Sequence, residues 1–395
     1  MTGKSGRDAG SAISLLRHPK ARAAFWQMLA VALFVLVAWT MATTAAENLR
    51  AQNIASGFGF LDNPAGFGII QHLIPYTEAS SYGRAFLVGL TNTLLVAAVG
   101  IVIATLLGFS IGIARLSDNW LVSKLAEAYV EIFRNTPLLL QIFFWYFAVL
   151  RALPAPGDAL HPLPGVYVSN RGLALPKLGT DPEIWASVAA LGAGLVGAYL
   201  LRRRAERVRR TSGSAPKIRW SVTALVLGLP FAVFFVTGLP ARLTAPELAD
   251  FNFVGGVTLI PEFVALTLAL AIYTASFIAE IVRAGILSVA KGQREAANAL
   301  GLPQGLTLRL VILPQALRVI VPPLTSQYLN LTKNSSLAVA IGYPDLVAVF
   351  AGTVLNQTGQ AIEVIALTMA VYLTLSLATA LAMNWFNART DWAAR

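Results

Sequence analysis

The chain has 395 residues, of which 56% are hydrophobic and only 12% are charged. An ordinary soluble domain carries about 25% charged residues, so this composition excludes a disordered tail, a fibrous protein and a typical cytosolic enzyme. The net charge of +11 does not indicate nucleic-acid binding, because the basic residues lie in short loops between apolar runs. Cysteine is absent and the three histidines are far apart, so we expect no metal site.

Eight apolar stretches approach the roughly 20 residues that a helix needs to cross a bilayer. We therefore predict an all-α polytopic membrane protein with about eight transmembrane helices. The stretches are Phe25–Thr44, Ala85–Ala114, Tyr129–Leu150, Ile184–Leu201, Ser221–Leu239, Glu262–Ala284, the weaker Arg318–Gly342, and Ala361–Phe386. The first could be a signal peptide cleaved after Thr44-Ala45-Ala46, but its apolar core exceeds the 7–15 residues typical of such peptides. We interpret it as an uncleaved anchor.

The distribution of basic residues predicts the orientation of these helices. Most of the 30 Lys and Arg fall on the side that holds both termini and the loops after the second, fourth and sixth stretches. The opposite side holds only Arg50, Arg84, Arg151, Arg171, Lys177 and Arg242. We therefore expect a multi-pass protein of a bacterial inner membrane, with both termini cytoplasmic.

Two loops in the middle of the chain leave alternatives open. The cytoplasmic loop at 202–219 carries eight basic residues, and it is interpreted either as a topology determinant or as a site for a partner or anionic lipid. The outer loop at 151–183 carries six prolines, which oppose a helix and favour an extended excursion. That excursion is equally compatible with a docking surface and with a plain linker.

The cytoplasmic segment between the sixth and seventh stretches has strong local signals. Gly292 allows a turn, and the run from Glu295 to Leu300 consists of good helix formers. Gly301 and Pro303 end this helix. A second short helix is predicted from about Gln304 to Leu313, and Pro314 begins the return into the bilayer. The expected result is a short helix outside the membrane with small alanines on its surface.

This segment resembles the EAA loop of binding-protein-dependent ABC importer permeases. The resemblance rests on Glu295-Ala296-Ala297, on Gly301 and on Leu313-Pro314, while Val311 stands where the family prefers isoleucine. It implies a type I importer architecture in which the loop at 291–314 docks in a cleft of a separate ATP-binding subunit. The coupling residues it implies are Gly292, Glu295, Ala296, Ala297, Gly301 and Pro314.

Three further motifs resemble the histidine/glutamine type of polar amino-acid permease. They are Glu131–Gln141, Ala279–Ile286 with Gly292-Gln293, and Leu331–Leu337. The resemblance covers about 85–150 and 262–390, and the extra helices resemble the longer subunit of general L-amino-acid or glutamate/glutamine/aspartate/asparagine importers. It implies four kinds of partner: a second permease that is related but different, two ATP-binding subunits holding ATP and Mg²⁺, an extracytoplasmic amino-acid-binding protein, and membrane lipid. We divide the chain into 1–84, a first core part at 85–150, a two-helix insertion at 151–261, and a second core part at 262–395.

Polar side chains within the apolar stretches are expected to face the bundle or a cavity. Tyr273, Ser276, Glu280 and Arg283 share one helix face, and so do Pro322, Ser326, Asn330 and Lys333. Pro322-Pro323 removes two backbone donors, which predicts a discontinuous helix of the kind that transporters use to bind zwitterions. The candidate substrate path comprises Gln141, Ser276, Glu280, Asn330, Lys333, Asn334 and Ser335, with Lys333 near the substrate carboxylate. The alternative for Lys333 and Glu280 is a structural ion pair.

The sequence offers no catalytic residues. Gly3-Lys4-Ser5 lacks the rest of a phosphate-binding loop, and the glycines of 192–197 lie inside an apolar stretch, where they indicate helix packing. The glycines of 108–112 allow close helix contact, either within the chain or between subunits. We therefore predict a transport subunit, with no cofactor held by this chain. The alternative function, an ion-coupled secondary transporter, needs carboxylate relays, for which Glu280 is the one deep candidate.

Overall fold

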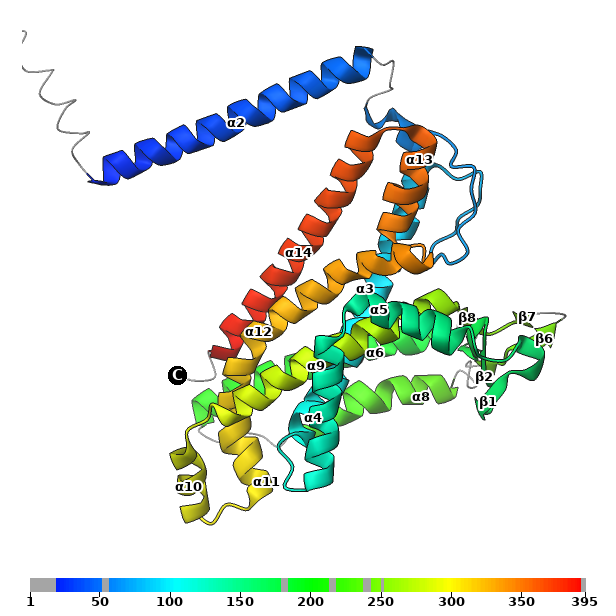
Figure 1. Ribbon diagram of the computed structural model, residues 1–395. Coiled ribbons are helices and arrows are strands. Elements are labelled where there is room, and N and C mark those ends of the chain that lie inside the picture. Colours follow the sequence, from blue (N-terminus) through cyan, green and yellow to red (C-terminus); the bar gives the residue numbers. More distant parts are fainter. Residues whose placement is uncertain are drawn as a thin grey trace, which may run out of the picture.

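A computed structural model describes residues 19–51, 57–178, 184–212, 218–236, 243–249 and 252–391 (Figure 1). Most of the described chain is helical. The α-helices are α2 (Pro19–Ala51), α3 (Tyr82–Ala114), α4 (Trp120–Asn135), α5 (Leu138–Phe143), α6 (Ile184–Ser212), α7 (Arg219–Thr223), α8 (Leu229–Val236), α9 (Pro261–Leu287), α10 (Lys291–Ala299), α11 (Gln304–Thr307), α12 (Leu313–Asn334), α13 (Leu355–Thr358) and α14 (Ala361–Asp391). The π-helical segments are η2 (Phe144–Leu150), η4 (Ala224–Gly228), η5 (Leu308–Ile312) and η7 (Val347–Val354), and the 3-10 segments are η1 (Phe58–Asp62), η3 (Pro156–Asp158) and η6 (Ser335–Ile341).

The apolar stretches of the sequence become the long helices. Within the described residues, five helical segments are long and apolar enough to cross a membrane: Arg22–Met41, Tyr82–Ala114, Pro261–Leu287, Gln304–Ile341 and Ala361–Trp385. A bent pair, Trp120–Asn135 with Leu138–Leu150, makes a sixth if it is counted as one span. The predicted fourth and fifth stretches lie in α6 and in the shorter apolar helix Trp220–Val236. Figure 1 shows α2 apart from the other helices.

The predicted span at Tyr129–Leu150 is wrong as a single helix. The chain bends by 106° between α4 and the segment that begins at Leu138. Thr136 adopts an extended conformation, with φ −95° and ψ 128°, and Pro137 follows it. A residue before proline is disfavoured in the helical region, and proline lacks the amide donor that would continue the ladder. Tyr129 therefore belongs to α4, ahead of the bend.

The centre of the fold is the contact between α3 and α9. α9 buries most of its length, including Leu266, Leu270 and Ile278. A methyl group on Gly108 would stand 2.5 Å from the Ile278 side chain, and one on Gly112 would stand 2.7 Å from the Ala279 carbonyl oxygen. These glycines therefore serve packing within the chain, which decides between the two predicted roles.

The two-helix insertion forms a hairpin with a small sheet at its base. A methyl group on Gly194 of α6 would lie 2.1 Å from the Leu225 carbonyl oxygen, so the predicted glycine packing is confirmed there. The strands are β1 (Leu160–Leu163), β2 (Val166–Ser169), β3 (Gly172–Leu175), β4 (Lys177–Leu178), β5 (Leu243–Thr244), β6 (Glu247–Ala249), β7 (Asn252–Val254) and β8 (Val257–Leu259). One antiparallel sheet has the order β1-β2-β3-β8, and β4-β5 and β6-β7 form two-stranded pairs. The proline-rich outer loop at 151–183 therefore contains short strands, which the all-α prediction did not include.

The seventh predicted stretch differs from the expected broken helix. α12 continues through Pro322 and Pro323 as one α-helix. The change of geometry comes later, where η6 begins at Ser335 and ends at Gly342, which has a left-handed φ of 76°. The predicted discontinuity at the two prolines is therefore wrong, and the irregular backbone lies at the polar run instead.

Candidate functional site

The segment at 291–314 forms a helical elbow that leaves and re-enters the bundle. α10 begins directly after Ala290, whose extended ψ of 135° makes the turn. Gly292 lies inside α10, so the prediction that it makes the turn is wrong. α10 ends where Leu302 N donates to the Ala297 carbonyl at 3.1 Å and Gly301 N donates to the Asn298 carbonyl at 2.9 Å. Gly301 has φ 72°, as the helix-end prediction required.

The side chains of the elbow divide into an inner and an outer face. Ala297 is 3% exposed and packs inward, so the expectation that all the alanines lie on the surface fails for it. Glu295 and Ala296 are exposed, and Leu300 is 79% exposed. The exposed face of the elbow therefore presents a carboxylate, a small side chain and an apolar side chain. Sequence reasoning missed Leu300, although its place at the helix end was known.

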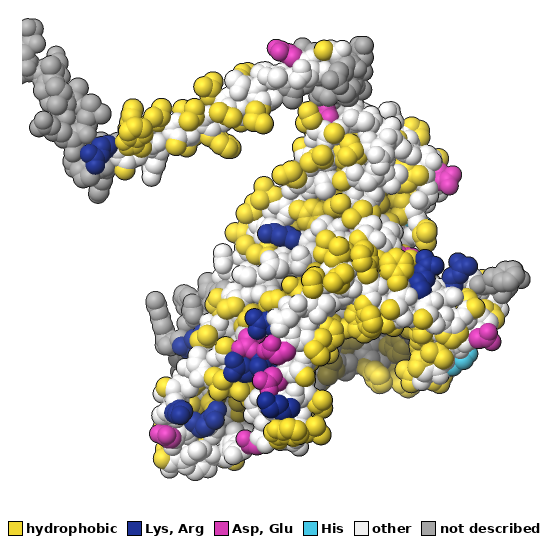
Figure 2. Space-filling model, in the orientation of Figure 1, with side chains coloured by type: hydrophobic (Ala, Val, Ile, Leu, Met, Phe, Trp, Pro, Cys, Tyr) yellow, Lys and Arg dark blue, Asp and Glu magenta, His cyan; other side chains and the backbone are white. Residues whose placement is uncertain are grey.

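A pocket of about 280 Å³ lies between the end of α9, α10 and η5. Its polar wall is Lys291, Arg294, Glu295 and Asn298, and its apolar wall includes Ile286 and Ile312. The elbow returns through α11 and η5, and Pro314 occupies the first turn of α12. Gln315 Nε2 then donates to Gln293 Oε1 at 3.3 Å, which joins the two arms of the elbow. Figure 2 shows Lys, Arg, Asp and Glu side chains gathered over this lower part of the molecule, with hydrophobic side chains above.

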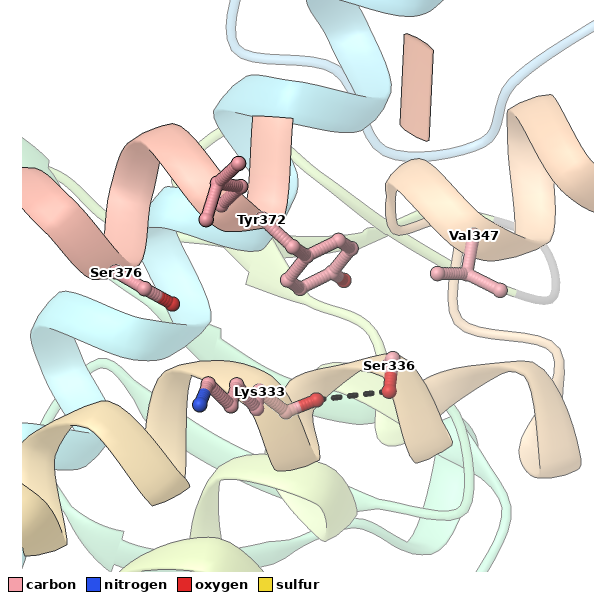
Figure 3. A pocket seen from close by; sticks show the side chains of 6 residues that line it. Lys333, Ser336, Val347, Tyr372 and Ser376 are labelled. Atoms are coloured by element: carbon pink, nitrogen blue, oxygen red, sulfur yellow. Dashed lines mark hydrogen bonds between the residues drawn. The ribbon is translucent and has the colours of Figure 1, made fainter. Parts of the chain in front are cut away.

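Lys333 lines a second pocket, of about 400 Å³, between α12, η7 and α14. Figure 3 shows Lys333 and Ser336 on one side of this pocket and Tyr372 and Ser376 of α14 on another. Ser336 Oγ donates to the Lys333 carbonyl at 2.7 Å. Within the described chain, the Lys333 ammonium makes no ion pair. Pro322, Ser326, Asn330 and Lys333 are all exposed, so the predicted common face of α12 points out of this chain's own core.

Glu280 is held by two arginines of its own chain. It accepts a hydrogen bond from Arg115, which follows α3, and another from Arg283 Nη2 at 2.6 Å. The alternative prediction of a Lys333–Glu280 ion pair is therefore wrong. Sequence spacing reveals the Arg283 partner, one turn away in α9. It does not reveal Arg115, which lies on another helix.

Three other candidate residues bond to backbone carbonyls. Gln141 is 4% exposed, and its Nε2 donates to the carbonyls of Phe133 at 2.9 Å and Thr136 at 3.0 Å, across the bend after α4. Ser276 is fully buried and donates to the Tyr273 carbonyl at 2.6 Å. Ser335 is also fully buried and donates to the Thr332 carbonyl at 2.7 Å. Asn334, in the last turn of α12, is half-buried.

A buried carboxylate missed by sequence reasoning is Asp345, which is 0% exposed. Its Oδ1 accepts from Ala348 N at 2.8 Å, and its Oδ2 accepts from Tyr372 Oη at 3.2 Å. The first bond caps the start of η7, and the second ties that start to α14. Nearby, Leu346 N donates to Thr93 Oγ1 of α3 at 3.0 Å. The only sequence signal was an aspartate just before a short apolar run, a common helix-start pattern. Among the described residues, no group of His, Asp or Glu is arranged to hold a metal ion.

Comparison with known proteins gives a consistent result over most of the chain. Residues 100–392 match the family described as "Binding-protein-dependent transport system inner membrane component". The chain is 54% identical to a "Putative amino-acid ABC transporter permease protein" of Escherichia coli (strain K12), covering 94% of this chain and 95% of that protein. It is 52% identical to a "General L-amino acid transport system permease protein" of Rhizobium johnstonii, covering 95% and 94%. It is 40% identical to a "Glutamate/glutamine/aspartate/asparagine transport system permease protein" of Rhodobacter capsulatus, covering 96% of each.

Proposed function

This chain belongs to the family of binding-protein-dependent transport system inner membrane components, and on that basis we propose that it is the membrane-spanning subunit of an ATP-driven amino-acid importer. The three relatives described above are named as amino-acid transport permeases, which supports this class of substrate. The chain acts as a transport subunit and not as an enzyme. The proposal depends most on one structural observation, the exposed elbow formed by α10, Gly301 and α11.

The elbow is proposed to dock on a separate ATP-binding subunit, which holds ATP and Mg²⁺. Glu295, Ala296 and Leu300 supply a charged, a small and an apolar contact on its outer face. Gly301 and the inward Ala297 fix the orientation of that face, and Pro314 directs the return helix. Gly292 is proposed to let the partner approach the first turn of α10 closely. Motion of the ATP-binding subunits then reaches α9 and α12, the helices that flank the elbow.

The docking proposal is tested by reversing the polarity of the exposed Leu300. We expect Leu300→Asp to lose the ATP-binding subunit during purification of the complex, while the chain still inserts into the membrane. Leu160→Asp is the matched control, because Leu160 is 51% exposed but lies on β1, far along the chain from the elbow. Retention of the ATP-binding subunit by Leu300→Asp at the control level contradicts the proposed docking.

The substrate path is proposed to run along the exposed face of α12, past Asn330 and Lys333. The Lys333 ammonium is the group proposed to meet the substrate carboxylate, and Asn334 lies beside it at the start of the irregular backbone. The remaining candidates have partners that favour supporting roles: Gln141 stabilises the bend after α4, Ser276 and Ser335 bond within their own helices, and Glu280 is neutralised by two arginines.

A second permease subunit is proposed to face this surface, because polar groups exposed to lipid at membrane depth are unfavourable. The full assembly is proposed to contain that second, related permease, two ATP-binding subunits and an extracytoplasmic amino-acid-binding protein. Both termini are proposed to be cytoplasmic. The core parts at 85–150 and 262–395 are proposed to form the transport unit, with 1–84 and 151–261 as additions. The relatives give no support to the ion-coupled alternative.

A further inference from the structure

A groove of about 410 Å³ runs between α6 and the segment formed by α7 and η4, in the two-helix insertion. Leu195, Tyr199 and Arg202 line it from α6, and Val226 and Leu227 line it from η4. We propose that this groove binds one anionic phospholipid, with an acyl chain against the apolar walls and the headgroup phosphate on Arg202.

The shape of the groove follows from the packing of the hairpin. Leu195, Tyr199 and Arg202 are spaced by four and three residues, so they lie on one face of α6. Gly194 brings α6 against the backbone at Leu225, where a methyl group would stand only 2.1 Å from the carbonyl oxygen. The helices are therefore closed against each other at Gly194, and the groove extends from that contact toward Arg202.

The two ends of the groove have opposite chemistry. Leu195 and Leu227 are 53% and 65% exposed, so the apolar end opens toward the surface of the hairpin. At the other end Arg202 is exposed, and the Arg203 guanidinium stacks over the Tyr199 ring at 4.8 Å. Trp220, at the start of α7, is 82% exposed. Tryptophan and arginine at the end of an apolar helix are typical of the bilayer interface.

These features select a phospholipid over other ligands. The apolar surface of the hairpin faces hydrocarbon in a membrane, where the surrounding molecules are lipids. A soluble phosphate gains nothing from the apolar walls, and the positive charge of the Arg202 end favours an anionic headgroup over a zwitterionic one. α6 continues beyond the groove with further basic residues at 203, 204 and 207, so the local potential stays positive. The arginine-rich segment would then contribute to lipid binding in addition to setting the topology.

The absence of cysteine allows a sharp test in the full chain. Leu227→Cys at the rim of the groove carries the only thiol, and a fluorophore attached there is read in vesicles of brominated phosphatidylglycerol or brominated phosphatidylcholine mixed with unlabelled lipid. We expect stronger quenching by the anionic lipid. In this background Arg202→Gln should lower the apparent affinity for phosphatidylglycerol about fivefold, the factor for one basic residue near an anionic headgroup.

Arg204→Gln is the matched control. It removes the same charge from the same helix, but position 204 lies about 200° around α6 from position 202. We expect this variant to change the affinity by less than about twofold, because the groove keeps its arginine. Equal quenching by both lipids in the Leu227→Cys parent overturns the proposal. Equal losses of affinity for phosphatidylglycerol in the two arginine variants also overturn it, because they indicate diffuse electrostatic attraction. Loss of the preference on addition of inorganic phosphate also overturns it, because the site then recognises phosphate alone.

Discussion

Arg115, the residue that follows α3, forms an ion pair with Glu280 of α9. Arg283 holds the other oxygen of the same carboxylate, at 2.6 Å, one turn further along α9. The three side chains are partly buried. They tie the end of α3 to α9 two turns before α9 ends at Leu287 and the elbow begins. Movement of the elbow is therefore expected to pass to α3 as well as to α9.

The pairing of Glu280 predicts the outcome of two double-mutant cycles. Glu280→Gln combined with Arg115→Gln should show a coupling free energy between about 0.5 and 3 kcal/mol, because the two groups are in contact. Glu280→Gln combined with Lys333→Met should be additive within about 0.5 kcal/mol. The free energy of unfolding is measured by denaturant titration in detergent. A coupling free energy between Glu280 and Lys333 as large as that between Glu280 and Arg115 would support a Lys333–Glu280 ion pair and contradict the pairing seen in the structure.

The contact of α3 with α9 predicts different responses for two glycines of one helix. Gly108→Ala should destabilise the chain by about 1–3 kcal/mol, because its new methyl group would stand 2.5 Å from Cβ of Ile278. Gly100→Ala is the control, since its methyl group would meet only the flexible end of Leu331, at 3.3 Å. The buried Leu331 has to shift by a few tenths of an ångström, which offsets the roughly 1 kcal/mol by which alanine favours a helix over glycine, so this control should change the stability less than Gly108→Ala does. The two variants are compared by thermal unfolding, with size-exclusion chromatography as the detection method. Equal melting temperatures would contradict the packing argument.

At Gly301, we predict that the charge of a substituted side chain affects the coupling of ATP hydrolysis to uptake more than its size does. The left-handed φ of 72° is accessible to asparagine and aspartate, and nothing lies within 4 Å of a methyl group placed there. Gly301→Asn should therefore retain most transport, whereas the nearly isosteric Gly301→Asp should separate ATP hydrolysis from uptake by placing a carboxylate in the docking surface. Glu295→Lys should have the same effect as Gly301→Asp.

Both activities are measured on the reconstituted complex, with ATPase rate and amino-acid uptake read from the same vesicles. Equal loss of uptake in Gly301→Asn and Gly301→Asp would point to backbone strain and remove the case for a charge-sensitive contact. Normal coupling in both Gly301→Asp and Glu295→Lys would contradict the proposed role of the elbow.

The pocket at Lys333 predicts a charge requirement in transport. Lys333→Met should lower uptake at least about tenfold with little change in basal ATPase activity, because a carboxylate loses a charged hydrogen bond worth roughly 1.5–3 kcal/mol. Lys333→Arg should retain part of the uptake. Lys124→Met is the control, since Lys124 is an exposed lysine paired with Glu127 at 2.7 Å. Uptake by Lys333→Met at the level of this control would remove Lys333 from the substrate path.

The elements that sequence reasoning located well are those with local causes. The C-terminal end of α10 follows from Gly301 and Pro303, and the long helices follow from the apolar composition of their stretches. The bend before Leu138 had an equally local cause in Pro137, but an apolar run of the right length concealed it. Pro322 and Pro323 gave the opposite error, because α12 continues through both prolines as one α-helix.

Two contacts of acidic side chains had no local sequence signal. Glu280 meets Arg115 from α3, and Asp345 meets Tyr372 from α14, so both contacts depend on how distant helices pack. Amphipathic spacing placed Asn330 and Lys333 correctly on one face. It could not tell that this face points away from the chain's own core, because periodicity does not say which side a neighbour covers.

The pairing of β3 with β8 sets Leu173 opposite Leu259, just before α9 begins. The chain thus departs toward the α6–α8 hairpin and comes back at nearly the same point, through one narrow stem. Sequence beyond such a stem can be lengthened, trimmed or exchanged without displacing η2 or α9. The hairpin is in this sense a modular attachment, free to diverge in its lipid or protein contacts while the transport core keeps its spacing.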